Sequence, residues 1–160
     1  MAEEFEVVVI GGGPGGYAAA LYGAAAGLRI AVVERDKVGG TCLHRGCIPA
    51  KQFLETATVF RTVVGAKEFG VVADQPSIDF GAAQARKQKV VDQLWKGLQT
   101  LMRGRKITTV IGTGRLGPHH LVTVDDGTEL RGRHTVLLEP YGYRWYRVGG
   151  LDYLLRRREF

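Results

Sequence analysis

The residues most able to do chemistry are the two cysteines, Cys42 and Cys47, which are the only cysteines among the 160 residues. Two thiols at this spacing can ligate a metal ion, pack as buried side chains, or form a disulfide that opens and closes in a redox reaction. Pro49 and a helix-compatible segment, residues 50–64, follow directly. Cys47 is therefore expected at or just before a helix N-terminus, a position that favours the thiolate form.

The surrounding residues bear on these three alternatives. A structural zinc site needs about four ligands, yet only His44 is near the cysteines, and the other histidines follow far along the chain. The flanking Gly-Gly-Thr and Gly-Cys-Ile-Pro are not typical of a buried core. A dithiol–disulfide centre fits the spacing and the helix start, so we favour it over the zinc site and the buried thiols, which are the less favoured alternatives. Our expectation is therefore that the cysteines hold no metal ion.

A glycine-rich turn lies upstream of the cysteines, between a predicted strand and a predicted helix. Residues 5–10 are apolar except for Glu6 and rich in β-branched side chains, and residues 17–26 are rich in small helix-compatible side chains. The turn between them, residues 11–16, has the spacing G-x-G-x-x-G. A second strand, residues 29–34, ends in an acid 23 residues after the first glycine. This order predicts a dinucleotide-binding β-α-β unit.

Each position of this unit has a physical role. Gly11 allows the tight turn out of the strand, Gly13 lets the backbone approach a pyrophosphate, and Gly16 lets the helix lie close to the strand. The helix N-terminus offers N–H groups and a partial positive charge to the phosphates. Glu34 stands where an acid binds a ribose hydroxyl, and its charge disfavours the 2′-phosphate of an NADP-type ligand.

The remaining pattern predicts an α/β protein with flanking helices, a parallel sheet and a small antiparallel β-meander. A short strand-like piece is expected at 69–73, and a long amphipathic helix is expected at about 80–103. Further strands are expected at 107–111, 121–124, 129–131 and 135–138, with a hairpin turn at 125–127. Beyond residue 138 the sequence is aromatic and basic without a clear period, so residues 139–160 are treated as an atypical tail.

Charge and hydropathy limit the partners. The net charge is +6, but the segment from Arg131 onward has seven arginines against three acidic residues and so carries +4 of it. Because the basic residues are concentrated there, we expect no nucleic-acid partner. No apolar run approaches the roughly 20 residues of a membrane span, and the first residues are acidic rather than basic. We therefore expect a cytoplasmic protein without membrane attachment.

Residues 39–51, Gly-Gly-Thr-Cys-Leu-His-Arg-Gly-Cys-Ile-Pro-Ala-Lys, resemble the active-site segment of the class I pyridine nucleotide–disulfide oxidoreductases. Within this family they look most like the dihydrolipoamide dehydrogenases. Glutathione and mercuric reductases share the cysteine spacing and are alternative subfamilies. The resemblance covers residues 5–138 and implies that residues 1–138 are the N-terminal part of a Rossmann-like FAD-binding domain.

The resemblance also implies the roles of individual residues. Electrons would pass from dihydrolipoamide, on the lipoyl domain of a 2-oxo acid dehydrogenase complex, through the cysteines and FAD to NAD. Cys42 would exchange with the substrate disulfide, Cys47 would be the flavin-side thiolate, and Lys51 would reach the flavin ring. The implied contacts with FAD are Gly11, Gly13, Pro14, Gly15, Gly16, Glu34, Arg35, Gly40, Thr41, Cys42, Cys47, Lys51 and Gly114.

Two departures from the family pattern are visible. After residues 135–138 the family continues with Ala-Thr-Gly, whereas this chain has Glu139-Pro140-Tyr141. The family is also several times longer, with an NAD domain, a second FAD-contacting segment, and an interface domain that supplies a His–Glu pair across a homodimer. We therefore expect a truncated or frame-disrupted chain that is not active alone. The alternative is an inactive remnant that at most binds FAD or an adenine nucleotide.

Overall fold

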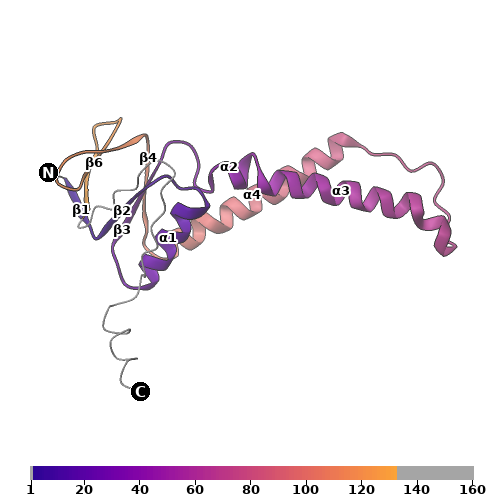
Figure 1. Cartoon of the computed structure of the whole chain (residues 1–160), viewed down its shortest axis with the longest axis horizontal. Coiled ribbons are helices and arrows are strands. Elements are labelled where there is room, and N and C mark those ends of the chain that lie inside the picture. The colour runs from indigo at the N-terminus through magenta and orange to yellow at the C-terminus, as the bar shows by residue number, and fades with distance from the viewer. Residues whose placement is uncertain (1, 133–160) are drawn as a thin grey trace, which may run out of the picture. The chain divides into compact units, whose positions relative to one another are not determined.

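The computed structural model describes residues 2–132, which fall into two compact units (Figure 1). The first unit contains residues 1–38 and 101–160, of which 2–38 and 101–132 are described. The second unit contains residues 39–100. Each unit is considered by itself.

A three-stranded parallel sheet forms the centre of the first unit. Its strands are β2 (Val7–Ile10), β3 (Ile30–Glu34) and β4 (Thr108–Ile111), in the order β2-β3-β4. Helix α1 (Pro14–Ala25) connects β2 to β3 and packs against both. All five residues of β3 are buried, as expected for the middle strand of a sheet covered on both faces. The predicted β-α-β unit and parallel sheet are confirmed.

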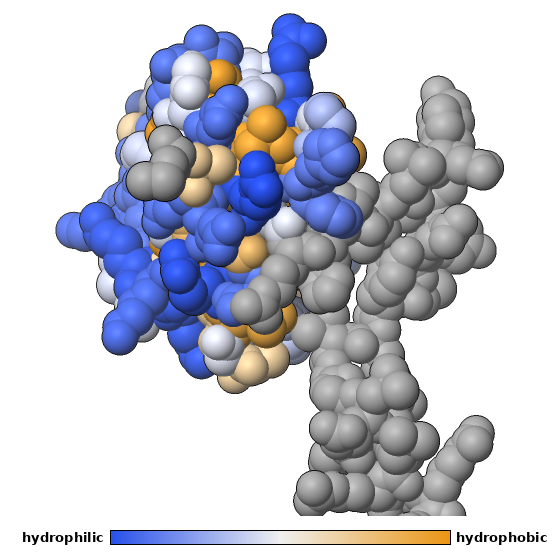
Figure 2. All heavy atoms as spheres, turned by 90° about the vertical axis from the view of Figure 1, so that its left-hand side faces the viewer, coloured by the Kyte–Doolittle hydropathy of each residue, from blue (hydrophilic) through white to orange (hydrophobic). Residues whose placement is uncertain are grey.

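A second sheet completes this unit. Strands β5 (Gly114–Leu116), β6 (Leu121–Val124) and β7 (Glu129–Gly132) form an antiparallel meander, and β1 (Glu3–Phe5) pairs with β7 in parallel. The meander was predicted, but β5 was not. The buried side chains that join the two sheets are Phe5, Ala31, Val33, Val122, Val124 and Leu130. Figure 2 shows the side of this unit where β1 and β6 lie, with polar side chains around smaller apolar areas.

The turn between β6 and β7 has the local chemistry that its sequence predicts. Gly127 has φ +86°, which favours glycine, and its N–H donates to the Val124 carbonyl at 2.9 Å. The Thr128 N–H donates to Asp126 Oδ1 at 2.8 Å. Two hydrogen bonds from Thr128, the larger effect from its backbone N–H and the smaller from its side chain, hold the pKa of Asp126 below its ordinary value.

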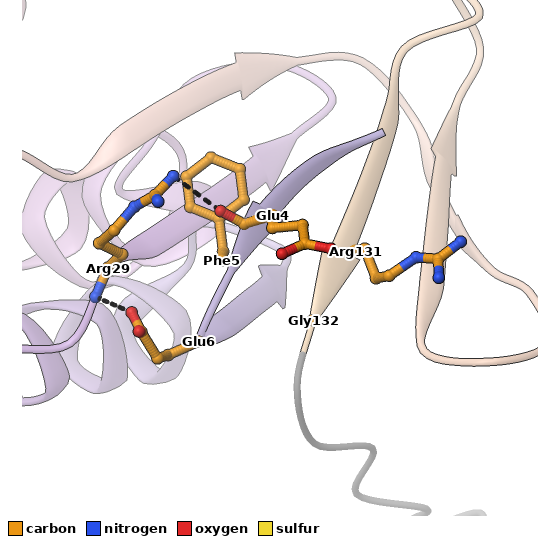
Figure 3. A pocket seen from close by; sticks show the side chains of 6 residues that line it. All are labelled: Glu4, Phe5, Glu6, Arg29, Arg131 and Gly132. Atoms are coloured by element: carbon orange, nitrogen blue, oxygen red, sulfur yellow. Dashed lines mark hydrogen bonds between the residues drawn. The ribbon is translucent and has the colours of Figure 1, made fainter. Parts of the chain in front are cut away.

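The predicted single strand over residues 5–10 is wrong, because the chain bends at Glu6 and its two halves join different sheets. Arg29 accounts for the bend. Its backbone N–H donates to Glu6 Oε2 at 2.6 Å, its Nη2 donates to the Glu4 carbonyl at 2.7 Å, and its guanidinium lies 5.5 Å from the Phe5 ring centre. Figure 3 shows these groups around a cavity of about 130 Å³, with Arg131 pointing away.

The second unit is helical. Its elements are α2 (Gly40–His44), α3 (Cys47–Gly65), the 3₁₀ turn η1 (Ala66–Phe69), and most of α4 (Phe80–Gly104). Helices α3 and α4 contact each other through the stacked rings of Phe53 and Phe80, 5.5 Å apart, and through a 2.7 Å hydrogen bond from Arg86 Nη1 to Gln52 Oε1.

One element of this unit was missed and one expectation is wrong. Helix α2 was not predicted, because its five residues are too few to show a hydrophobic period. The strand-like piece expected at 69–73 is wrong. Phe69 ends η1, and residues 71–74 have no regular structure, since the second unit contains no strand that could pair with them. The strand expected at 135–138 and the tail 139–160 lie outside the described residues.

Candidate functional site

The glycine turn follows the carboxyl end of β2 in a conformation that few other residues could adopt. Gly11 has φ +97°, and its N–H donates to the Val33 carbonyl of β3 at 2.7 Å. A Cβ atom built on Gly16 would lie 1.8 Å from the Gly11 carbonyl oxygen. Because that oxygen belongs to the backbone, no small side-chain adjustment could relieve the overlap, so position 16 requires glycine.

The N-terminus of α1 faces open space. Gly13 is the N-cap residue and makes no side-chain capping bond, and Pro14 begins the helix. Pro14 and Gly15 are exposed, and a Cβ atom built on Gly13 or Gly15 would meet no atom of residues 2–132 within 4 Å beyond their chain neighbours and the nearby backbone of α1 itself. The first-turn N–H groups of a twelve-residue helix therefore border a space that an anionic group could fill.

Glu34 ends β3 beside this turn. The side chain is only 9% exposed, Oε2 accepts the Gly12 N–H at 2.7 Å, and Oε1 accepts the Asp36 N–H at 3.0 Å. The two bonds fix the carboxylate at the carboxyl edge of the parallel sheet. Arg35 follows on the surface and is exposed.

Gly114 brings a third segment to the same edge. A Cβ atom there would lie 3.0 Å from Val33 Cγ1 and 3.3 Å from Ile10 Cγ2, so the backbone passes close to the ends of β2 and β3. The preceding Gly112 N–H donates to the Glu34 carbonyl at 2.9 Å. The structure thus brings together Gly11, Gly13, Gly16, Glu34 and Gly114. The other residues predicted within this unit lie next to them, Pro14 and Gly15 at the start of α1 and Arg35 directly after Glu34.

Sequence reasoning missed two groups at this edge. Gly12 was assigned no role, yet its N–H binds the Glu34 carboxylate, and a Cβ there would lie 3.3 Å from that side chain. Asp125 was noted only as part of a turn, yet its Oδ1 accepts the Thr113 N–H at 3.0 Å. No spacing rule connects Thr113 to Asp125; the pairing depends on the tertiary fold.

In the second unit, Cys42 and Cys47 form a disulfide, with their Cα atoms 4.6 Å apart. Cys42 belongs to α2 and is half-buried, whereas Cys47 is the first residue of α3 and is exposed. Gly46 lies between the two helices as the N-cap of α3. The prediction that Cys47 lies at a helix N-terminus is confirmed.

The residues before and after the disulfide have defined positions. Gly39 and Gly40 have φ of +110° and +58°, and a Cβ on Gly39 would lie 2.4 Å from the Leu43 side chain. Thr41 lies in α2 next to Cys42 and is exposed. Lys51 is exposed one turn after Cys47 in α3, so the two residues share a helix face.

The predicted site residues therefore form two groups, one in each unit. The first group lies at the carboxyl edge of the parallel sheet, and the second surrounds the α2–α3 disulfide. Among residues 2–132, no cluster of three or more His, Cys, Asp or Glu is arranged to hold a metal ion. In the same range, no helix is both long enough and apolar enough to cross a membrane.

A parallel β-α-β unit with a glycine turn and a terminal acid, followed by a disulfide at a helix start, defines a dinucleotide-binding disulfide oxidoreductase. Residues 5–137 match the family "Pyridine nucleotide-disulphide oxidoreductase", and the chain belongs to this family.

Several curated relatives bear the same name, dihydrolipoyl dehydrogenase. The Bacillus subtilis protein is 52% identical over 119 residues, which are 74% of this chain and 25% of the relative. The Chlamydia pneumoniae protein is 43% identical over 86% of this chain and 30% of its own length. The Haloferax volcanii protein is 37% identical over 92% of this chain and 32% of its own length. The chain thus spans about a quarter to a third of these relatives.

Proposed function

We propose that residues 1–138 form the N-terminal part of an FAD-binding domain whose Cys42–Cys47 disulfide exchanges electrons with a dithiol substrate. The disulfide at the start of α3 carries the proposal. The disulfide joins two helices across a glycine N-cap, and because Cys42 is half-buried rather than buried, its sulfur is the proposed point of attack for a thiolate, with the exposed Cys47 as the leaving group. The first unit supports the choice of cofactor through its open helix N-terminus and its adjacent carboxylate.

The fit to FAD follows from the donors at the sheet edge. The backbone N–H groups of Gly13, Gly15 and Gly16 would bind the pyrophosphate, with the positive end of the α1 dipole behind them. Glu34 would accept a hydrogen bond from a ribose hydroxyl, as acids at this position do. Pro14, Arg35 and Gly114 border the same edge and complete the proposed contacts of the first unit.

When bound, FAD supplies a two-electron acceptor for the thiol pair. The chain's own residues carry out the exchange with substrate. A thiolate of dihydrolipoamide attacks the Cys42 sulfur, the Cys42–Cys47 bond breaks, and Cys47 leaves as a thiolate. The second substrate thiolate then attacks the substrate sulfur of the mixed disulfide and releases Cys42. The substrate is oxidised by two electrons to a disulfide, the protein pair is reduced by two, and the two thiol protons remain with solvent or the released thiolates.

The proposed roles of the neighbours follow from their positions. Cys47, as the first residue of α3, gains stabilisation of its thiolate from the helix N-terminus, which suits a leaving group and a cofactor-side thiolate. Gly40, Thr41 and Lys51 are proposed to contact the flavin, with the Lys51 ammonium near the ring. The catalytic residues of the proposal are Cys42 and Cys47.

The activity of the whole protein belongs to the same proposal. The relatives' name, dihydrolipoyl dehydrogenase, favours this subfamily over glutathione- and mercuric-reductase-like proteins. NAD would then be the final electron acceptor. The whole protein would be a homodimer, and its partner would be a lipoyl domain of a 2-oxo acid dehydrogenase complex. We place the protein in the cytoplasm, where closely spaced cysteines are more often catalytic than structural.

A binding and trapping experiment tests this proposal. The purified chain is titrated with FAD while flavin fluorescence is followed, and the C42S and C47S variants are then mixed with oxidised lipoamide. We expect saturable FAD binding, and a mixed disulfide on Cys42 in C47S that exceeds the one on Cys47 in FAD-loaded C42S. Mass spectrometry measures the adduct.

Each outcome has a distinct meaning. Preferential trapping on Cys47 would reverse the two cysteine roles. Binding of FAD without adduct in either variant would leave only a remnant that holds FAD or an adenine nucleotide. Absence of FAD binding would contradict the cofactor assignment.

A further inference from the structure

His44, which lies between the two cysteines, contacts Trp95 of α4. The ring centres are 5.7 Å apart with an interplanar angle of 80°, the edge-to-face geometry that aromatic rings prefer. Both side chains are half-buried, and both belong to the second unit. The contact therefore joins the short helix that carries Cys42 to a helix that is distant in the sequence.

Helix α2 needs such support. It has five residues, and helices this short are marginal without tertiary contacts. Its own turn is closed by bonds such as Arg45 N–H to the Thr41 carbonyl, 2.8 Å. The contacts that tie it to the rest of the unit include the disulfide to Cys47, the burial of Leu43, and the ring contact of His44. Reduction removes the disulfide and leaves the others.

Helix α4 is a suitable platform for this contact. Its 25 residues run alongside α3, to which it is joined by the Phe53–Phe80 stack and the Arg86–Gln52 hydrogen bond. Helix α3 carries Cys47 at its first position. A ring contact to α4 thus holds the Cys42 helix against the same helix pair that holds Cys47.

We propose that Trp95 is a positioning residue for the redox pair: through His44 it keeps the Cys42 thiol beside Cys47 in the dithiol state and so favours reclosure of the disulfide. The inference rests on the proposed function, because it concerns the same thiol pair. Loss of the ring contact gives the reduced form more freedom than the oxidised form, which the disulfide still restrains. The equilibrium should therefore shift toward the dithiol.

The test is the thiol–disulfide equilibrium constant of the chain in dithiothreitol buffers, read by alkylation and mass spectrometry. The sequence has only these two cysteines, so every label reports on the pair. We expect W95L and H44L each to weaken disulfide formation by about three- to tenfold, the size of an aromatic pair contribution. Tenfold corresponds to about 30 mV for this two-electron couple. W95F, which keeps a ring edge, should stay within about twofold of the unmodified chain.

A double-mutant cycle separates this contact from general destabilisation. In H44L/W95L the effect should equal that of one single variant, because both remove the same contact. L94A is the matched control, since Leu94 is exposed on the neighbouring position of α4, and it should leave the constant unchanged. If W95L loses its helical circular dichroism signal, the equilibrium constants of H44L and W95F test the role of the ring contact instead.

Two results contradict different claims. Equal constants in the unmodified chain, H44L and W95L, or additive effects in the double variant, would overturn the role of Trp95 while the redox pair stands. A disulfide that cannot be reduced and reformed in the unmodified chain would overturn the proposed function itself.

Discussion

At the residue scale, Glu34 links the fold to the proposed ligand. Its carboxylate is buried and accepts two backbone N–H groups, one of them from Gly12 in the glycine turn. The same carboxylate is the proposed acceptor for a ribose hydroxyl. The hydrogen bond from Gly12 to Glu34 thus stabilises the glycine turn without a ligand.

The contribution of Glu34 can be measured by substitution. E34A leaves the buried Gly12 N–H without its acceptor and should lower the free energy of unfolding by about 1–3 kcal/mol. E34Q keeps one acceptor oxygen and should lose less. R35A, at the exposed neighbour, should stay within about 0.5 kcal/mol. Urea denaturation measures all three, and equal stability of E34A and R35A would contradict this role.

Gly15 and Gly16 are adjacent glycines of α1 with opposite surroundings. In G16A the new methyl group would overlap the Gly11 carbonyl, and we expect a loss of about 1–3 kcal/mol from the forced backbone shift. In G15A the methyl group meets open space, and alanine in a helix should gain about 0.5–1 kcal/mol. Thermal unfolding followed by circular dichroism compares them, and a G16A variant as stable as G15A would show that the turn tolerates a side chain.

At the element scale, the turn of the β6–β7 hairpin should lose stability at low pH. The Asp126 carboxylate accepts the Thr128 N–H, and these bonds lower the pKa of Asp126 in the folded chain. Its stabilising contribution is therefore present above the ordinary Asp pKa of about 3.9 and is lost as the pH falls through the lower folded value. Carboxyl NMR titration should give a pKa below the ordinary value; a normal or raised pKa would exclude the bond to Thr128.

Local patterns predicted the elements whose sequence signals are local. Glycine spacing and the acid at Glu34 located the β-α-β unit, and Pro49 marked the first turn of α3. The bend at Glu6 and the contact of His44 with Trp95 depend on residues far along the chain, Arg29 in the first case and α4 in the second. Helix α2 is too short to show a period. Such features are set by tertiary contacts, which a single sequence does not display.

At the scale of the whole molecule, each of the two units contributes a different part of the proposed function. The first supplies the groups for a dinucleotide, and the second supplies the thiol pair. A ligand that binds only the folded state raises stability by mass action. FAD at 100 times its dissociation constant should therefore stabilise the chain by about 2.7 kcal/mol. NAD at the same concentration serves as the comparison, and equal stabilisation by both would contradict selectivity for FAD.

The central claim is that Cys42 and Cys47 form a disulfide that cycles with a dithiol substrate. The most direct measurement equilibrates the chain without oxygen at several ratios of dihydrolipoamide to lipoamide and counts alkylated cysteines by mass spectrometry. We predict that both cysteines are labelled together as dihydrolipoamide increases and are protected together as lipoamide is restored. Labelling that does not depend on the ratio, or that stops at one cysteine, would contradict the claim.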